Sequence, residues 1–273
     1  MARGSIVCSV AAVVIGVAAW GPRVSDVGAA DREGAPAGAA VPVLVELFTS
    51  EGCSSCPPAD RVLAQLAESG LDGIPIIALS EHVDYWNRLG WKDPFSAARF
   101  TDRQQQYADV LRSDVYTPQM VVDGRRQLVG SDRASAVDEI RKAAAAQKLE
   151  VKAAATRQGA ELVVTAIVHA AAGGRAPKAD VVVAVTEDGL ESNILRGENR
   201  GLRLAHAAVT RYLSPAARLD ARATDGVTVR VKIDPAWRLE RSKAIVIVQS
   251  PIDLSVLGAA SVSLDPNLQT ALE

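Results

Sequence analysis

The chain has 273 residues, enough for one large domain or two ordinary ones, and 48% of them are apolar, so real hydrophobic cores can form. The formal net charge is −2 and no dense basic run occurs, which argues against a nucleic-acid partner. Aromatic residues are scarce, at 4%, so a local concentration of them is informative.

The first 30 residues have the order of a secretory signal peptide. Arg3 gives a positive start, residues 6–20 carry no charge, and small residues follow at 27–30. The uncharged core is shorter than the roughly 20 residues that a membrane-spanning helix needs. We therefore predict a signal peptide at 1–30, a flexible linker at 31–40, and a periplasmic or secreted mature protein with no membrane span. An uncleaved membrane anchor is the alternative.

Residues 41–150 alternate strand-like and helix-like stretches. The stretch 43–48 is apolar on both faces except for Glu46, as in a strand buried in the middle of a sheet. Asp123-Gly124 is a strong hairpin signal, and Ser131 or Asp132 can cap the last helix. The predicted strands are 43–48, 74–79, 119–122 and 127–129, and the predicted helices are 59–69, a segment around 100–111, and one that begins after 132. This β-α-β-α-β-β-α order is the minimal thioredoxin layout.

From about residue 151 the pattern is β throughout. Several short strands with regular turns favour a sandwich. The strand candidates are 161–169, 180–186, 204–213, 227–233 and 243–249. We therefore predict an α/β thioredoxin-like N-terminal domain at 41–150, followed by a mainly antiparallel, sandwich-like β domain at 151–273.

Cys53-Ser54-Ser55-Cys56 lies between the first predicted strand and the first predicted helix, and its two cysteines are the only ones outside the predicted signal peptide. In an oxidising compartment such a pair is either a redox centre or an inert staple. A sulfur at a helix N-terminus is favoured as thiolate, so we expect Cys53 to be the nucleophile and Cys56 to resolve the mixed disulfide. The pair closes too short a loop to stabilise the fold much, which favours the redox interpretation.

Three separate segments are expected to meet beside these cysteines. Sites in open α/β sheets form beyond the carboxyl ends of the parallel strands, where both Cys53 and residues 81–86 lie. Thr117-Pro118 precedes a strand that must run antiparallel, so its start falls on the same edge. The convergence is a stronger argument for a site than the two cysteines alone.

Residues 44–60, which include the cysteine pair, together with 82–86, Gly90-Trp91 and 116–119, resemble an exported bacterial family of thioredoxin-like proteins that is classified as domain of unknown function 1223. More distantly, the first domain is similar to thioredoxins. The resemblance implies a redox-active Cys53–Cys56 pair and a cis-proline at Pro118, but it supplies no substrate. The chain departs from thioredoxins at Gly52, where they place a tryptophan, and at Pro57-Pro58, which lets the helix begin closer to Cys56.

Five further residues are candidates for the site. Burial would raise the pKa of Glu46 and suit it to accept a proton from the buried thiol, although a strand-end glutamate that reaches water is the alternative. A cis bond would turn the backbone of Thr117 toward a substrate chain. We expect His82, Tyr85 and Trp86 to contact substrate, with simple packing as the competing interpretation.

The favoured function is thiol–disulfide exchange on a protein or small-thiol client, with no cofactor beyond the Cys53–Cys56 disulfide. A second hypothesis is a Cu(I)-binding or metallochaperone module that uses Cys53, Cys56 and His82. A third is a non-enzymatic binding protein with a static disulfide. In the second region, residues 197–201 with His206 form the one distinctive local motif, which resembles a turn that enters a strand. We expect a structural or partner-binding role for it.

Overall fold

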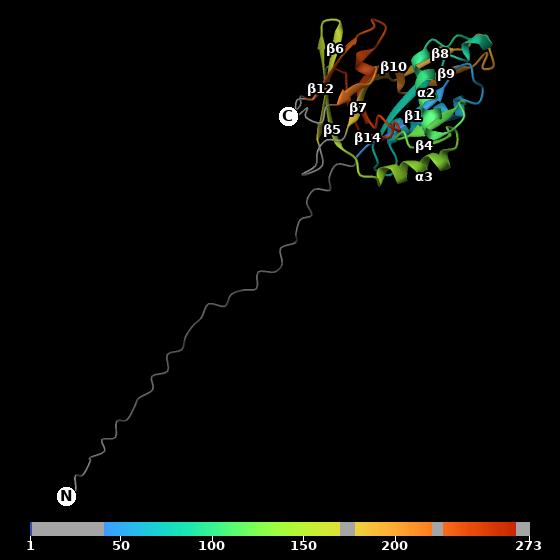
Figure 1. Cartoon of the computed structure of the whole chain (residues 1–273). Helices are drawn as coiled ribbons and strands as arrows, with labels where there is room; N and C mark the ends of the chain where they lie inside the picture. The colour runs from blue at the N-terminus through green and yellow to red at the C-terminus, as the bar shows by residue number, and fades with distance from the viewer. Residues whose placement is uncertain (2–40, 170–177, 220–225, 266–273) are drawn as a thin grey trace, which may run out of the picture. The chain divides into compact units, whose positions relative to one another are not determined.

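The computed structural model describes residue 1 and residues 41–169, 178–219 and 226–265 (Figure 1). The predicted signal peptide and linker therefore lie outside the described residues, apart from Met1. Within the described part, no helix combines the length and apolar character needed to cross a membrane.

The first half of the described chain follows the predicted order of elements. The second strand lies two residues later than predicted and the first helix begins earlier, at Pro57, because the two prolines fit a first helical turn. The predicted cap of the last helix is confirmed, since Asp132 accepts a hydrogen bond from the Ser135 backbone N–H at 3.1 Å. The elements are β1 (Val43–Thr49), α1 (Pro57–Ser69), β2 (Ile76–His82), the 3₁₀ turn η1 (Asn87–Leu89), α2 (Ala98–Leu111), β3 (Gln119–Val122), β4 (Arg126–Val129) and α3 (Arg133–Ala144).

The second half is almost entirely β, as its alternation predicts. The candidate strand at 204–213 is divided in two around Ala208, which has a φ of 52°. The strands are β5 (Glu150–Gln158), β6 (Glu161–His169), β7 (Ala179–Glu187), β8 (Leu190–Asn193), β9 (Arg203–His206), β10 (Val209–Leu213), β11 (Ala217–Leu219), β12 (Val227–Lys232), β13 (Ser242–Gln249) and β14 (Val256–Ser263), with the 3₁₀ turn η2 (Leu239–Arg241).

One large sheet contains strands from both halves. Its order is β14-β13-β7-β10-β2-β1-β3-β4, and β11 pairs with β7 at the side of this path. β1 is parallel to β2 and antiparallel to β3, and β10 joins the two halves by pairing in parallel with β2 at Val209 and Ser80. The change of pattern near residue 150 therefore marks no break in this sheet, and the described residues from 41 onward form one compact unit. The fold is a mixed α/β architecture dominated by strands.

The two faces of β1 are buried under different elements. Val45 and Leu47 pack on one face with Leu63 of α1 and Ile140 of α3. On the other face, Phe48 packs against Tyr107 of α2. Burial of β1 on both faces, as predicted, leaves its carboxyl end as the place where the chain emerges into the cysteine loop.

A second, three-stranded sheet in the order β12-β6-β5 packs on the β7–β13 part of the large sheet (Figure 1). Leu162 and Val164 of β6 share one apolar core with Val183 of β7 and Val246 of β13. This sheet-on-sheet packing is the sandwich-like element of the second half. The hairpin β8–β9 forms a separate two-stranded sheet that is not hydrogen-bonded to either of the other sheets.

Candidate functional site at the cysteine loop

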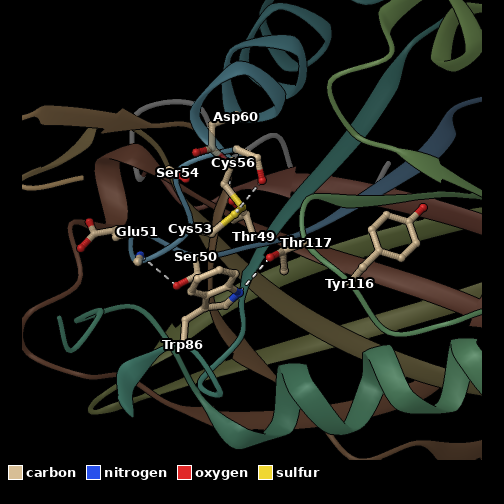
Figure 2. The surroundings of a disulfide bond; sticks show 12 residues. Thr49, Ser50, Glu51, Cys53, Ser54, Cys56, Asp60, Trp86, Tyr116 and Thr117 are labelled. Carbon is tan, nitrogen blue, oxygen red and sulfur yellow. Dashed lines mark hydrogen bonds between the residues drawn. A yellow bond between two sulfur atoms is a disulfide. The ribbon is translucent and has the colours of Figure 1, made fainter. Parts of the chain in front are cut away.

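Cys53 and Cys56 form a disulfide with Cα atoms 5.4 Å apart, at the point where the loop after β1 enters α1 (Figure 2). Cys56 is the N-cap residue of α1, and its carbonyl accepts the first helical hydrogen bonds, from Ala59 and Asp60. Neither cysteine exposes any surface, whereas Ser54 and Ser55 between them are exposed. The disulfide is thus correctly placed for helix-terminus redox chemistry, but it is closed to solvent in this conformation.

The predicted convergence at the sheet edge is present. Trp86, which follows β2, donates its indole N–H to the Thr117 hydroxyl at 2.8 Å, beside the disulfide (Figure 2). The Thr117–Pro118 peptide bond is cis, as expected. A Cβ atom at position 52 would lie 3.3 Å from Trp86 Cβ and 3.7 Å from the Trp86 carbonyl oxygen, so the chain at Trp86 lies close against the loop at Gly52.

Pro118 packs under the start of α1. It is buried, and its carbonyl accepts a hydrogen bond from the Gly130 N–H at 2.9 Å. A Cβ atom on Gly130 would lie 3.5 Å from Pro118 Cβ and 3.1 Å from Cβ of Ala59, three residues after Cys56. The same Cβ would lie only 2.6 Å from Leu47 Cδ1, so glycine at position 130 lets the chain after β4 lie close against β1 and the start of α1.

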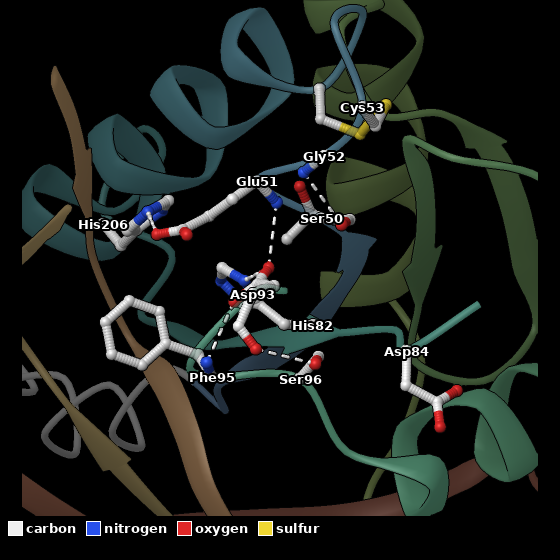
Figure 3. Close-up of polar contacts among 12 residues, drawn as sticks. Ser50, Glu51, Gly52, Cys53, His82, Asp84, Asp93, Phe95, Ser96 and His206 are labelled. Carbon is white, nitrogen blue, oxygen red and sulfur yellow. Dashed lines mark hydrogen bonds and ion pairs between the residues drawn. A yellow bond between two sulfur atoms is a disulfide. The ribbon is translucent and has the colours of Figure 1, made fainter. Parts of the chain in front are cut away.

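Two buried histidine–carboxylate pairs lie directly behind the cysteine loop (Figure 3). His82 Nδ1 lies 2.7 Å from Asp93 Oδ2, and His206 Nε2 lies 3.0 Å from Glu51 Oε1. The two imidazole rings are 4.9 Å apart between centroids in an edge-to-face arrangement. Asp93 also accepts the Glu51 backbone N–H at 2.8 Å, which ties the two pairs together two residues before Cys53.

Burial and charge pairing set the protonation of this cluster. Burial alone would lower the pKa of His82, but the facing carboxylate of Asp93 outweighs it and raises that pKa above its ordinary value. The same pairing holds the pKa of Asp93 below its ordinary value, despite burial. In the first turn of α1, burial raises the pKa of Asp60, whose carboxylate accepts a hydrogen bond from the Thr49 hydroxyl at 2.7 Å.

Glu46 does not point toward this cluster. It lies on the α2 face of β1, where Arg103 donates to one of its carboxylate oxygens at 2.5 Å and Tyr107 to the other. Burial, and next to it the neighbouring charge of Glu46, raise the pKa of Glu81 well above its ordinary value. One oxygen of Glu46 is thus engaged in a buried ion pair and the other in a hydrogen bond, which favours a structural role over the proton-acceptor role expected from its position in the strand.

The remaining predicted residues are placed as follows. Tyr85 is half-buried and donates its hydroxyl to Gln104 at 3.2 Å, while His82 is fully buried and held by Asp93. Both side chains are thus held by hydrogen bonds within the protein. Of the three residues expected to contact substrate, Trp86 lies nearest the cysteine loop. Among the described residues, no group of three or more His, Cys, Asp or Glu side chains is placed to hold a metal ion.

Besides His206, two further residues of the second half reach the cysteine loop, and none of the three was predicted as a site residue. Asn199 donates its side-chain amide to the carbonyls of Glu51 and Cys53, at 2.8 and 2.9 Å. Glu198 accepts the backbone N–H of Ser54 at 3.0 Å. The sequence signal was the local character of residues 197–201, but nothing in it indicated contact with a loop 146 positions earlier.

The model of the DUF1223 family, described as a protein of unknown function, matches residues 44–249, which spans the cysteine loop, both histidine pairs and the 197–201 loop. The chain belongs to this family. No protein with a curated description matches it.

Two solved structures share the fold. A protein from Agrobacterium tumefaciens, known from an X-ray crystal structure, is 28% identical, with a TM-score of 0.63 over 86% of this chain and 98% of that one. HBP35 of Porphyromonas gingivalis gives the same TM-score at 18% identity, over 85% of this chain and 78% of its own. The first match includes nearly the whole of the Agrobacterium protein, so both halves of the chain belong to one shared architecture.

Proposed function

We propose that this protein is a thiol–disulfide oxidoreductase with a thioredoxin-like redox site, in which Cys53 and Cys56 exchange with the thiols or disulfide of a protein or small-molecule client. The observation that carries the proposal is the Cys53–Cys56 disulfide across the N-terminal end of α1, with Trp86 and the cis Thr117–Pro118 segment beside it. A helix N-terminus stabilises a thiolate there, which a purely structural disulfide does not require.

In the reducing direction, the Cys53 thiolate attacks one sulfur of a client disulfide, and the other client sulfur leaves as a thiolate. The Cys56 thiolate then attacks the Cys53 sulfur of the mixed disulfide, and the second client sulfur leaves. Two electrons pass to the client, its two sulfurs take up protons, and the Cys53–Cys56 disulfide forms again. A thiol reductant must restore the dithiol. The reverse steps oxidise a client dithiol.

The compartment belongs to the same proposal. The signal-like residues 1–30 support export to the periplasm or beyond the cell, where a close cysteine pair is oxidised unless it is actively reduced. Export accords with the oxidised pair seen here.

The test is equilibration of the purified protein with glutathione buffers of graded ratio, followed by alkylation to count free thiols. Redox function predicts a reversible two-electron transition within the range of glutathione buffers, and reduced protein that converts oxidised glutathione to thiol at a rate abolished by Cys53→Ser. A disulfide that stays closed at every ratio, or a rate that survives Cys53→Ser, would leave the static binding protein as the better description.

A further inference from the structure

The loop at residues 197–201, here called the clamp loop, closes over the cysteine loop from the second half of the chain. Its Asn199 is buried, and it holds the carbonyls of Glu51 and Cys53 with one amide group. Its Glu198 takes the Ser54 N–H, the amide adjacent to Cys53. Both ends of the segment that carries the first sulfur are thereby fixed by residues outside the N-terminal half.

The clamp loop is itself held in one shape. Gly201 donates its N–H to the Ile194 carbonyl at 2.8 Å, and Leu202 donates to the Asn199 carbonyl at 3.1 Å. Gly197 has a φ of 77° and a Cβ there would lie 3.2 Å from Trp91 Cβ, so this turn is seated against the segment that follows β2. The hairpin that carries the loop is anchored at its other end by His206 on Glu51. The clamp loop is therefore an ordered turn that is held in contact with the cysteine loop.

The clamp has an electrostatic consequence for the reduced protein. The backbone N–H groups around a CxxC turn are the donors available to a Cys53 thiolate, and here a carboxylate occupies one of them, the N–H of the next residue, Ser54. The hydrogen bonds from Ser54 lower the pKa of Glu198, so this group is negatively charged at neutral pH. A negative charge beside Cys53 disfavours a second negative charge on its sulfur.

We propose, on the basis of the function proposed above, that Glu198 and Asn199 are positioning residues that tune the cysteine pair: Glu198 holds Cys53 in a less acidic, more reducing state, and Asn199 keeps the disulfide covered until a client displaces the clamp loop. A dithiol whose thiolate is less stabilised gives up its electrons more readily, because stabilisation of the reduced form is what makes a CxxC pair oxidising. The clamp therefore biases the exchange toward reduction of clients.

The charge effect is tested with Glu198→Gln, which keeps an acceptor for the Ser54 N–H but removes the charge. Thiolate absorbance in the ultraviolet is followed against pH in full-length protein that carries Cys8→Ser and Cys56→Ser, so that only Cys53 contributes. The midpoint of thiolate formation should fall by roughly 0.2–0.7 of a pH unit, because Glu198 is exposed and water screens its charge. Glu198→Asp should restore it in part, and Glu191→Gln on the same hairpin should leave it unchanged. An unchanged midpoint in Glu198→Gln overturns the charge effect.

The cover is tested with Asn199→Asp, a near-isosteric change that replaces the amide donors with an acceptor facing two carbonyls. The rate at which dithiothreitol reduces the Cys53–Cys56 disulfide should rise about tenfold, the equivalent of one net hydrogen bond. Asn193→Asp, at an exposed position on β8, is the matched control and should reduce at the wild-type rate. Equal rates for both variants and wild type would overturn the cover.

These measurements separate the two proposals. Neither the thiolate midpoint nor the dithiothreitol rate depends on a natural client, so the clamp can fail while glutathione exchange succeeds. Conversely, if wild-type protein shows no exchange with glutathione but Glu198→Gln still shifts the midpoint, the proposed function fails and the clamp stands. A potential that becomes more oxidising in Glu198→Gln, measured in glutathione buffers, supports both.

Discussion

His82 Nδ1 lies 2.7 Å from Asp93 Oδ2, and neither side chain is exposed. The pair places an imidazole and a carboxylate behind the cysteine loop, and Asp93 also accepts hydrogen bonds from the backbone N–H groups of Glu51 and Phe95. Loss of the carboxylate would therefore affect the protonation of His82 and the path of the loop together.

The first prediction is that Asp93→Asn lowers stability in a pH-dependent way. The raised pKa of His82 contributes stability that is complete below the pKa of the unfolded chain and is lost as the pH rises through the pKa of the folded protein. The lowered pKa of Asp93 contributes stability that is present above its unfolded pKa and is lost as the pH falls through its folded pKa. The deficit of the variant should thus be largest near pH 6, at about 3 kcal/mol, and should shrink as the pH rises through the raised pKa of His82. Urea denaturation at several pH values measures it, with the exposed Asp102→Asn as control.

The second prediction concerns the order of attack. Cys53 precedes α1 and Cys56 caps it, so Cys56→Ser should accumulate mixed disulfides with glutathione or a protein client, whereas Cys53→Ser should not. Mass spectrometry of the trapped adducts gives the answer. Equal trapping by both variants, or by neither, contradicts the assignment of Cys53 as the nucleophile.

The third prediction separates structure from chemistry at Glu46. Arg103→Met removes the cation beside Glu46 and Glu81 and should cost about 3–5 kcal/mol, because the buried Glu46 carboxylate loses its counter-charge. Arg141→Met, which breaks an exposed pair with Asp72, should have a much smaller effect. Glu46→Gln should lower stability and leave the thiolate midpoint of Cys53 unchanged. A shifted midpoint would return Glu46 to the role of proton acceptor.

The fourth prediction addresses the copper hypothesis. With His82 buried and bound to Asp93, the reduced cysteine pair should bind Cu(I) through its two thiolates alone, and His82→Ala should leave the affinity unchanged. Competition against a chromogenic Cu(I) chelator measures this. A tight one-to-one complex that is lost in His82→Ala would favour the metallochaperone hypothesis.

Local patterns predicted the elements of the chain well. β6 and β3 have the predicted bounds, and the Asp132 cap and the hairpin around Asp123-Gly124 follow from side-chain and turn chemistry within a few residues. The cis bond before Pro118 and the meeting of three segments at one edge followed from the family resemblance and from the parallel-strand rule. These inferences succeed because each depends on neighbours close in sequence or on the direction of adjacent strands.

The contacts that distinguish this site could not be read from the sequence. Asn199 and His206 reach the cysteine loop across 146 and 155 positions, and their partners are a backbone carbonyl and a glutamate with no local signature. The surroundings of Glu46 could not be predicted for a related reason: the period of a strand shows that a residue is buried, but it does not show which helix supplies its counter-charge. Here Arg103 on α2 supplies the counter-charge of Glu46.

The pairing of β10 with β2 also determines where the chain can be divided into fragments. Ser80 donates its N–H to the Ala208 carbonyl at 2.8 Å, and Leu44, Ile77 and Leu79 share an apolar cluster with strands β7 and β13. A fragment that ended after α3 would leave the β2 backbone without its partner in β10. It would also expose Leu44, Ile77 and Leu79 to water, and this combination makes an edge strand prone to aggregation. The cysteine loop is therefore not a portable module: it can be studied, fused or displayed only with the strands that follow it.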